Sequence, residues 1–390
     1  MGALRSRLDC LMGPLEGIKV IELTGIGPGP FCAMMLGDMG ADVVRIDGIG
    51  GHPSNIDPRK SGRDRSRRAV GVDLKSEPGI KVALRLIDQA DALIEGFRPG
   101  VMERLGLGPE TCISRNPRLV YGRVTGWGQY GALSQAAGHD INYLGITGAL
   151  DAIGTTESGP VPPLNMLADF GGGGMLLTSG ILAALLSARE SGHGQVVDAA
   201  MSDGVPLLMG TAHTLAATGR WREKRHHNLV DGGAYFYGTY QCADGKWIAL
   251  GSIEPQFHDL LLEKLNLVSA PEFQNQYDRE NWPRARARLA QVFLTQEQAH
   301  WRTLLENTDV CFAPVLSMEE AVQHPHNQDR NTFIEIEGAK QAAPAPRFSR
   351  TPSDIPSAPR LPGEDNDKAL TDWGFNQDEI AQFKANGVVG

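Results

Sequence analysis

The chain has 390 residues, of which 41% are hydrophobic and 21% are charged, and its formal net charge is −9. This composition is that of an ordinary globular protein with a full core, and the length predicts about two or three domains. The negative charge argues against general nucleic-acid binding, which needs a basic surface, but it leaves room for a local basic site for an anionic ligand.

The first predicted elements form a β-loop-α-β unit. Lys19–Leu23 reads as a buried parallel strand, and Gly25–Pro30 is a glycine- and proline-rich turn. A helix is expected from Phe31 to about Met39, followed by a strand over Asp42–Asp47. This order predicts a doubly wound α/β domain with a parallel sheet.

A nicotinamide site is the obvious alternative reading of this turn, because Asp47 closes the second strand as it does in dinucleotide-binding folds. The glycine fingerprint fails in detail, since Pro30 takes the third glycine position. Pro28 and Pro30 also lack amide donors, so the turn is a poor cradle for a pyrophosphate. A tight strand-to-helix connection is the better interpretation.

Further strands and helices follow in alternation. The predicted strands are residues 70–74, 92–95, 119–124 and 194–200, and the predicted helices are residues 78–90 and 175–189. Asp244-Gly245, between two apolar runs, predicts a β-hairpin that begins a second domain. Helices then follow at residues 256–267, 283–295 and 298–307.

We therefore expect two domains. A large Rossmann-like domain spans residues 13–200 and is completed by residues 331–390, which return to it. Residues 201–227 form a linker helix, residues 228–330 form a small α+β domain, and residues 1–12 are an N-terminal extension.

Composition also bears on metals, thiols and membranes. The five cysteines show no metal-ligand or CxxC spacing, and neither do His226-His227 or His324-Pro-His326, so no metal site is predicted. Unpaired cysteines are typical of the reduced thiols of a cytoplasmic protein. No apolar run reaches the roughly 20 residues that span a bilayer, so membrane insertion is not expected.

Two segments carry side chains suited to proton transfer. His139 lies in the run Gly138–Tyr143, and Asp169 precedes the four glycines Gly171–Gly174 at the start of an apolar helical run. A carboxylate at a helix start is stabilised by free amides and by the helix dipole, and so is an enolate that forms beside it. The ionised form of Asp169 is therefore expected to be favoured, although proton transfer also requires this carboxyl to carry a proton, and the amides of Asp169 and Gly171 are candidate enolate donors.

From about residue 13 to its end, the chain resembles the family III CoA-transferases. The resemblance rests on the segments Pro14–Leu23, Gly27–Pro30, Ala41–Asp47, Gly96–Gly100, Leu167–Gly174 and Gly194–Met201. Within the family it is similar to the α-methylacyl-CoA racemases, through Gly138-His139-Asp140, Pro162–Asp169 and Gly251–Phe257.

The resemblance implies a function and an assembly. His139 and Asp169 would exchange the α-proton of a 2-methylacyl-CoA thioester on opposite faces, and Glu254 would hold the imidazole of His139. Asp140 is a candidate structural hydrogen-bonder, and Asn165 a candidate for orienting Asp169. The family forms interlocked homodimers, so Glu254 would act across the interface. No cofactor is required, because CoA is part of the substrate.

Two other functions stay open. A family III CoA-transferase would use Asp169 as a covalent nucleophile, although such enzymes typically carry a glycine-rich loop where this chain has Ser252–Gln256. A non-catalytic acyl-CoA-binding protein would need neither His139 nor Asp169 for chemistry. The acyl chain is also open, with branched fatty acyl, sterol side-chain and arylpropionyl thioesters as candidates.

Arginines are the expected partners of the CoA phosphates, because their guanidinium groups match phosphate geometry. The resemblance points to Arg65, Arg67, Arg68, Arg98 and Arg104. One departure is that Gly48-Ile49 stands where the family usually has a basic residue followed by proline.

Overall fold

This computed structural model describes residues 13–50, 57–353 and 357–390. The expected extension over residues 1–12 therefore lies outside the described residues. The chain divides into a first unit (Met1–Thr147, Leu164–Leu208 and Asn331–Gly390) and a second unit (Gly148–Pro163 and Met209–Arg330).

One segment belongs to a different unit from the one the sequence predicts. Gly148–Pro163 is expected in the large domain, whereas its contacts group it with the second unit. The reason is visible at Asp151, whose main-chain oxygen accepts a hydrogen bond of 2.8 Å from Arg225 Nη1. The two residues are 74 positions apart in the sequence, so no local sequence pattern predicts their contact.

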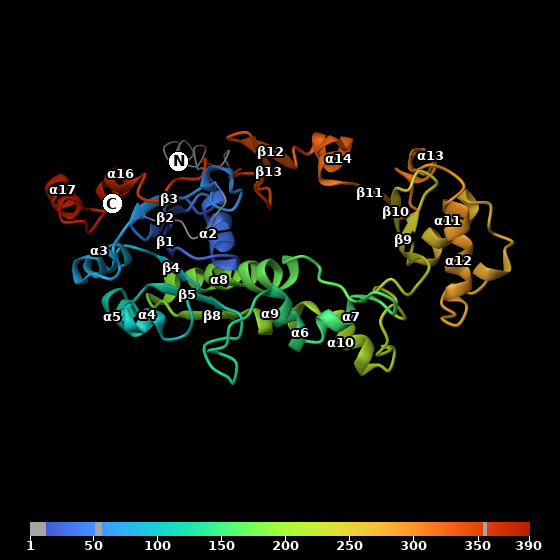
Figure 1. Cartoon of the computed structure of the whole chain (residues 1–390), viewed down its shortest axis with the longest axis horizontal. Helices are drawn as coiled ribbons and strands as arrows, with labels where there is room; N and C mark the ends of the chain where they lie inside the picture. The colour runs from blue at the N-terminus through green and yellow to red at the C-terminus, as the bar shows by residue number, and fades with distance from the viewer. Residues whose placement is uncertain (1–12, 51–56, 354–356) are drawn as a thin grey trace. The chain divides into compact units, whose positions relative to one another are not determined.

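The first unit is built on a six-stranded sheet in the order β3-β2-β1-β4-β5-β8, and every neighbouring pair is parallel. Its strands are β1 (Lys19–Leu23), β2 (Asp42–Asp47), β3 (Arg68–Gly71), β4 (Ala92–Glu95), β5 (Val120–Thr125) and β8 (Val196–Ala200). The strand labels follow this order down Figure 1. The predicted α/β class with a parallel sheet is confirmed.

Alternate residues of the central strands enter two different cores, because successive side chains of a strand point to opposite faces. Ile21 and Leu93 belong to a cluster with Trp373 of the C-terminal segment, whereas Val20 belongs to a cluster with Ile181. Both faces are thus covered, which is why the strands contain consecutive apolar residues such as Val20-Ile21 and Val43-Val44.

The helices of the first unit follow the expected alternation. They are α2 (Pro28–Asp38), α3 (Glu77–Ile87), α4 (Val101–Arg104), α5 (Pro109–Arg115), α6 (Asp140–Ile146), α8 (Leu176–Ser191), α9 (Met201–Leu208), α16 (Asn366–Asp372) and α17 (Gln377–Ala385), with the 3₁₀ turn η1 (Pro58–Lys60), the π-helix η2 (Met166–Met175) and the hairpin β12 (Phe333–Ile336) and β13 (Ala339–Ala342). Helix α2 begins three residues before the predicted start, since prolines fit a first helical turn.

Strand β3 ends at Gly71, three residues before the predicted end. Beyond it, Val72 makes an antiparallel bridge to Val389 at the end of the chain. A Cβ atom at Gly71 would lie 1.9 Å from the carbonyl oxygen of Gly390, so the C-terminus docks against this glycine. The return of the C-terminal segment thereby closes the β3 edge of the sheet.

Helices η2 and α8 are continuous, and this corrects one expectation. Met166–Ser191 is a helix of 26 residues that is long and apolar enough, by length and composition alone, to cross a membrane. The sequence does not predict it, because the four glycines break up the apolar run. In the structure α8 packs against β5 and β8, and the buried face of the helix includes Leu177, Ile181 and Leu185.

The second unit contains the antiparallel sheet β11-β10-β9. Its elements are α7 (Ala149–Ala152), β6 (Gly154–Thr155), β7 (Gly159–Pro160), α10 (Gly210–Ala217), β9 (Tyr237–Gln241), β10 (Trp247–Gly251), α11 (Pro255–Lys264), η3 (Pro271–Phe273), α12 (Trp282–Phe293), α13 (Gln298–Leu305), β11 (Phe312–Val315), α14 (Met318–Gln323) and α15 (Pro325–Asp329). Strands β9 and β10 form the predicted hairpin around Asp244-Gly245.

Candidate active site

A pocket of about 350 Å³ lies at the carboxyl ends of β1, β4 and β5. Strands β1 and β4 are neighbours from which the chain builds the sheet in opposite directions, and ligands of open parallel sheets bind at such a point. The lining includes residues 26–28, 96–99 and 124–127 together with Arg63, His139, Tyr143 and Asp169. The fold therefore brings the two predicted proton-transfer side chains to one pocket.

Asp169 lies in the first turn of the π-helix η2, four residues after the N-cap residue Asn165. The side-chain amide of Asn165 (Nδ2) donates to Asp169 Oδ2 over 3.1 Å. A Cβ atom at Gly27 would lie 3.5 Å from the same oxygen, and Gly27 has a φ of +71°. The positive φ is what favours glycine here, since a Cβ atom at 3.5 Å would make only an ordinary van der Waals contact.

The pKa of the Asp169 carboxyl is shifted upward. Burial raises the pKa of its carboxyl above the ordinary value of 3.8, and the nearby Asp140 carboxylate adds to the rise, while Asn165, His139 and Arg63 oppose it. Desolvation penalises the charged form, and burial is the largest of these contributions. The shift favours the proton-carrying form of the carboxyl, which proton transfer also requires.

Asp140 connects the two segments that bear His139 and Asp169. Its buried side chain accepts hydrogen bonds at Oδ2 from the amides of Ala168 (2.9 Å) and Asp169 (2.8 Å). Asp140 is also the first residue of α6, so one carboxylate joins the start of α6 to the start of η2. The predicted enolate donors are consequently engaged, since the Asp169 amide binds Asp140 and Gly171 lies inside the π-helix, where amides bond to carbonyls five residues earlier.

His139 is the N-cap residue of α6 and is exposed. Its own amide donates to Asn142 Oδ1 over 3.0 Å, which anchors its backbone at the helix start. Behind it, the ring of Tyr143 packs edge-on against Trp127, with centroids 4.7 Å apart. A Cβ atom at Gly126 would lie 2.0 Å from the Tyr143 ring, so a glycine is needed for α6 to reach this position.

Glu254 lies in the second unit and not in the lining of this pocket. It is the N-cap residue of α11, and Pro255 follows as the first helical residue. Its side chain is exposed and makes no capping bond, as expected for glutamate, which is not among the preferred N-cap residues. The carboxylate is thus presented outward from a defined backbone position.

The predicted CoA arginines fall into two groups. Arg65 and Arg67 are buried, and their guanidinium groups bind Asp38 (2.6 Å) and Glu22 (2.7 Å) respectively. Arg68 bridges Asp42 and Asp372. These three side chains are held by carboxylates of the first unit itself.

Arg98 and Arg104 are exposed, and Arg98 lines the pocket. Arg63 lines it as well, although it is not among the arginines expected to bind the CoA phosphates. Its sequence signal was the same as that of its neighbours, and the fold alone separates it from them. At the unusual Gly48-Ile49 position, the Ile49 side chain lies against the C-terminal Gly390.

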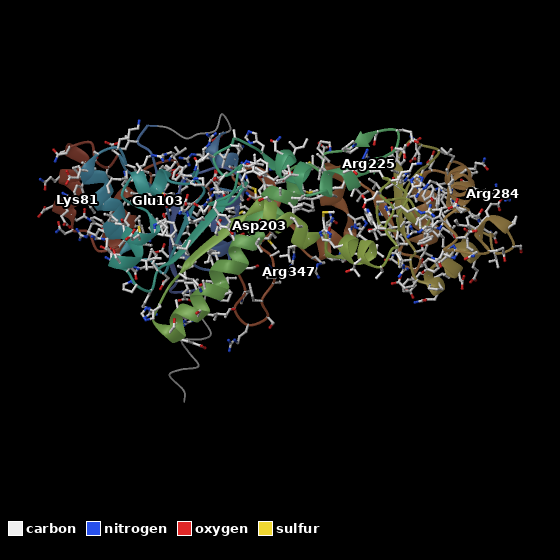
Figure 2. The ribbon with its side chains drawn as sticks, turned by 90° about the horizontal axis from the view of Figure 1, so that it is seen from below. Lys81, Glu103, Asp203, Arg225, Arg284 and Arg347 are labelled. Carbon is white, nitrogen blue, oxygen red and sulfur yellow. The ribbon has the colours of Figure 1, made fainter. Side chains whose placement is uncertain are left out.

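A buried ion pair that sequence reasoning missed fixes the wall containing Arg98. Glu95 accepts a hydrogen bond of 2.8 Å from the amide of Phe97 and another of 2.6 Å from Arg123 Nε. Arg123 also reaches Glu103 on α4, the helix that carries Arg104, and Glu103 is labelled in Figure 2. Burial raises the pKa of Glu95, and the Arg123 charge opposes that rise.

Within the described ranges, no group of three His, Cys, Asp or Glu side chains is arranged to hold a metal ion. The ionisable side chains that line the pocket are one imidazole, one carboxyl group whose pKa is raised, two arginines and the phenol of Tyr143.

The model of CoA-transferase family III matches residues 15–366. The chain belongs to this family. It is 45% identical to the α-methylacyl-CoA racemase of Mus musculus over 96% of this chain and 97% of the relative, and 44% identical to that of Homo sapiens over the same shares. The acetyl-CoA:oxalate CoA-transferase of Acetobacter aceti is 28% identical over 90% of this chain and 93% of that protein.

Among solved structures, the family III fold is shared with Rv3272 from M. tuberculosis. The TM-score is 0.77 at 26% identity, and the match covers 92% of this chain and 99% of that one. The similarity therefore extends over both units and not only over the parallel sheet.

Proposed function

We propose that this family III chain is an isomerase that interconverts (2R)- and (2S)-2-methylacyl-CoA thioesters. The observation that carries the proposal is the joint presence, in one pocket, of an imidazole and a carboxyl group with a raised pKa. The identity to the mouse and human racemases, at 45% and 44%, supports it.

In the proposed reaction, neutral His139 removes the α-proton from one enantiomer. The electron pair of the C–H bond moves into the thioester, which becomes an enolate. Protonated Asp169 then delivers a proton to the opposite face, and the electron pair returns to the α-carbon. His139 has gained a proton and Asp169 has lost one, and the other enantiomer reacts with the roles reversed. The raised pKa of Asp169 supports the protonated state that this sequence requires.

The enolate needs stabilisation that the Asp169 and Gly171 amides do not provide while they are engaged within the protein. We assign this role to the imidazolium that forms on His139 and to the positive end of the η2 dipole, which lies at Asp169. Both act on the developing charge without moving a backbone segment.

Glu254 is proposed to bind the His139 imidazole, and to do so across a homodimer interface as the family resemblance implies. Its exposed carboxylate and its lack of a capping bond support an external partner. Gel filtration tests this part, because an active monomer would contradict it.

For the CoA phosphates we favour Arg98 and Arg104 together with Arg63, since the first and third line the pocket. Arg65, Arg67 and Arg68 lose support because their charges are neutralised by carboxylates. No cofactor takes part in the proposed route, and the thioester is the activating group. We also propose a cytoplasmic location, which the absence of disulfides at Cys32, Cys112, Cys242 and Cys311 supports.

The test is proton exchange with a (2R)-2-methylacyl-CoA in D₂O without any acceptor acid. We expect deuterium at the α-carbon and a mixture of epimers with the unaltered protein, and at least a roughly thousandfold loss in His139→Ala and in Asp169→Ala. His193→Ala and Asp203→Ala are matched controls, because both side chains are exposed on the first unit and lie outside the pocket lining.

A CoA-transferase gives the opposite result, and the transferase activity of the Acetobacter aceti relative makes it the second candidate. It would show no exchange until a free carboxylic acid is added, and borohydride would trap a covalent adduct on Asp169. Tight CoA-ester binding without either reaction would identify a binding protein instead.

A further inference from the structure

The loop that presents Glu254 connects β10 to α11 and is anchored at the last residue of β10 and at the first residue of the loop. The amide of Gly251 donates to the carbonyl of Cys311 over 2.9 Å. Ser252 is buried, and its amide donates to Phe236 over 2.9 Å while its hydroxyl donates to Val310 over 2.6 Å. These bonds tie the start of the loop to the core of the second unit.

The next two carbonyls are held by residues from a segment more than twenty positions later. Gln276 Nε2 donates to the carbonyl of Ser252 over 3.0 Å and to that of Ile253 over 2.8 Å. The hydroxyl of Tyr277 donates to the same Ile253 oxygen over 2.7 Å. The Ile253 carbonyl therefore accepts two hydrogen bonds, one for each of its lone pairs.

This arrangement controls Glu254 through covalent geometry. The carbonyl of Ile253 belongs to the peptide bond that ends at Glu254, and a peptide group is planar. Fixing its oxygen at two points fixes that plane and with it the position of the Glu254 Cα atom. The Ser252 carbonyl fixes the preceding plane in the same way, so two consecutive peptide groups are immobilised.

Gln276 and Tyr277, which hold these two carbonyls, are themselves held by the core of the second unit. Gln276 is buried, and its own carbonyl accepts a hydrogen bond of 2.8 Å from the indole of Trp282, a core residue. The ring of Tyr277 packs edge-on against Phe236, with centroids 5.8 Å apart. The main-chain carbonyl of Glu254 accepts hydrogen bonds from the amides of Phe257 and His258, but no hydrogen bond to its carboxylate is present among the described residues.

We propose that Gln276 and Tyr277 are positioning residues for Glu254, and the proposal rests on the role of Glu254 given above. They bind neither substrate nor imidazole. They hold the backbone from which the Glu254 side chain extends, so that its carboxylate meets its partner in a single orientation.

The decisive comparison uses two glutamines with the same kind of bonding. Gln298 is also buried in the second unit, and its Nε2 also donates to two carbonyls, those of Trp247 (2.7 Å) and Val315 (3.3 Å), but it does not contact the Glu254 loop. Gln276→Met and Gln298→Met therefore remove equivalent bonds and differ in what those bonds hold.

We expect Gln276→Met to lower kcat about ten- to a hundredfold with KM within about twofold, because a small misplacement of a working group costs rate and not binding. Tyr277→Phe removes one bond from an exposed side chain and should lower kcat about threefold to fivefold in the folded protein. Gln298→Met should change thermal stability and leave kcat unaltered.

A double-mutant cycle with Glu254→Gln separates positioning from general damage. If Gln276 acts through Glu254, Gln276→Met causes little further loss of kcat in the Glu254→Gln background. An equal loss in both backgrounds overturns the proposal. If Glu254→Gln by itself leaves kcat unchanged, it is the assigned role of Glu254 that fails, and the two failures are thus distinguishable.

Discussion

The carboxyl edge of the parallel sheet has two halves that use the same residue types in opposite ways. At β1 and β2, Glu22 binds Arg67 and Asp47 binds Arg45, and all four side chains are buried. The ends of β4 and β5 carry a further buried pair, Glu95 with Arg123, but the loop after β4 opens into the pocket, where Arg98 faces solvent with no carboxylate partner within the described ranges. A guanidinium that finds a buried carboxylate becomes part of the fold, whereas one without a partner stays available to a ligand.

The largest effect is expected at the closed half of the edge, the buried ion pairs at β1 and β2, where the substitution to test is Arg67→Met. Removing one member of a buried ion pair leaves an uncompensated charge, and such changes destabilise proteins by about 3–5 kcal/mol. Burial raises the pKa of Glu22 even with Arg67 present, which indicates how poorly this site solvates a lone carboxylate. Urea unfolding measures the effect. The double change Arg67→Met with Glu22→Leu should restore much of the stability, and a stable Arg67→Met variant with a raised KM would instead make Arg67 a CoA ligand.

In the open half of the edge, where the pocket and Arg98 lie, a substitution should change substrate binding and leave the stability of the protein unaltered. Arg98→Met is expected to raise KM for the CoA thioester about tenfold, which corresponds to ~1.4 kcal/mol, because a phosphate contact is lost. The unfolding midpoint should stay the same. Arg118→Met is the control, since Arg118 is exposed just before β5 at the opposite edge of the sheet. The KM difference should shrink as salt is added, and a difference that is independent of salt would argue against a phosphate contact.

The smallest expected effect is on the pH dependence of stability, and it is produced by a substitution at Asp169. Its folded-state pKa is raised from 3.8, so the folded protein holds this proton more tightly than the unfolded chain does. Stability is therefore lost as pH rises from 3.8 through the raised pKa. Asp169→Asn should unfold at a higher temperature than the parent at pH 7, with no gain below pH 3.8, while proton exchange is abolished. Asp203→Asn, on the exposed side of α9, should show no such pH-dependent gain.

Patterns along the chain were sufficient for the sheet. The strands at Lys19–Leu23, Asp42–Asp47 and Ala92–Glu95 have the predicted bounds, because a strand buried on both faces has apolar side chains at consecutive positions. The Asp-Gly turn gave the hairpin of the second unit for an equally local reason, since its backbone geometry suits a tight turn between strands.

Local motifs also singled out His139 and Asp169, and the fold places both in one pocket. The motif did not predict the raised pKa of Asp169. A helix start and four glycines are visible in the sequence, but burial is a property of the packed structure, and it is the largest cause of the shift.

By itself, then, the sequence determined the α/β class, the order of the strands along the chain and the residues suited to proton transfer, because each depends on side chains that are near one another in the chain. Only the tertiary structure decided which arginines pair with carboxylates, how Asp140 joins α6 to η2, and that Gln276 holds the backbone before Glu254. These are contacts between residues more than twenty positions apart, and their energies depend on distance and burial, which no local pattern records.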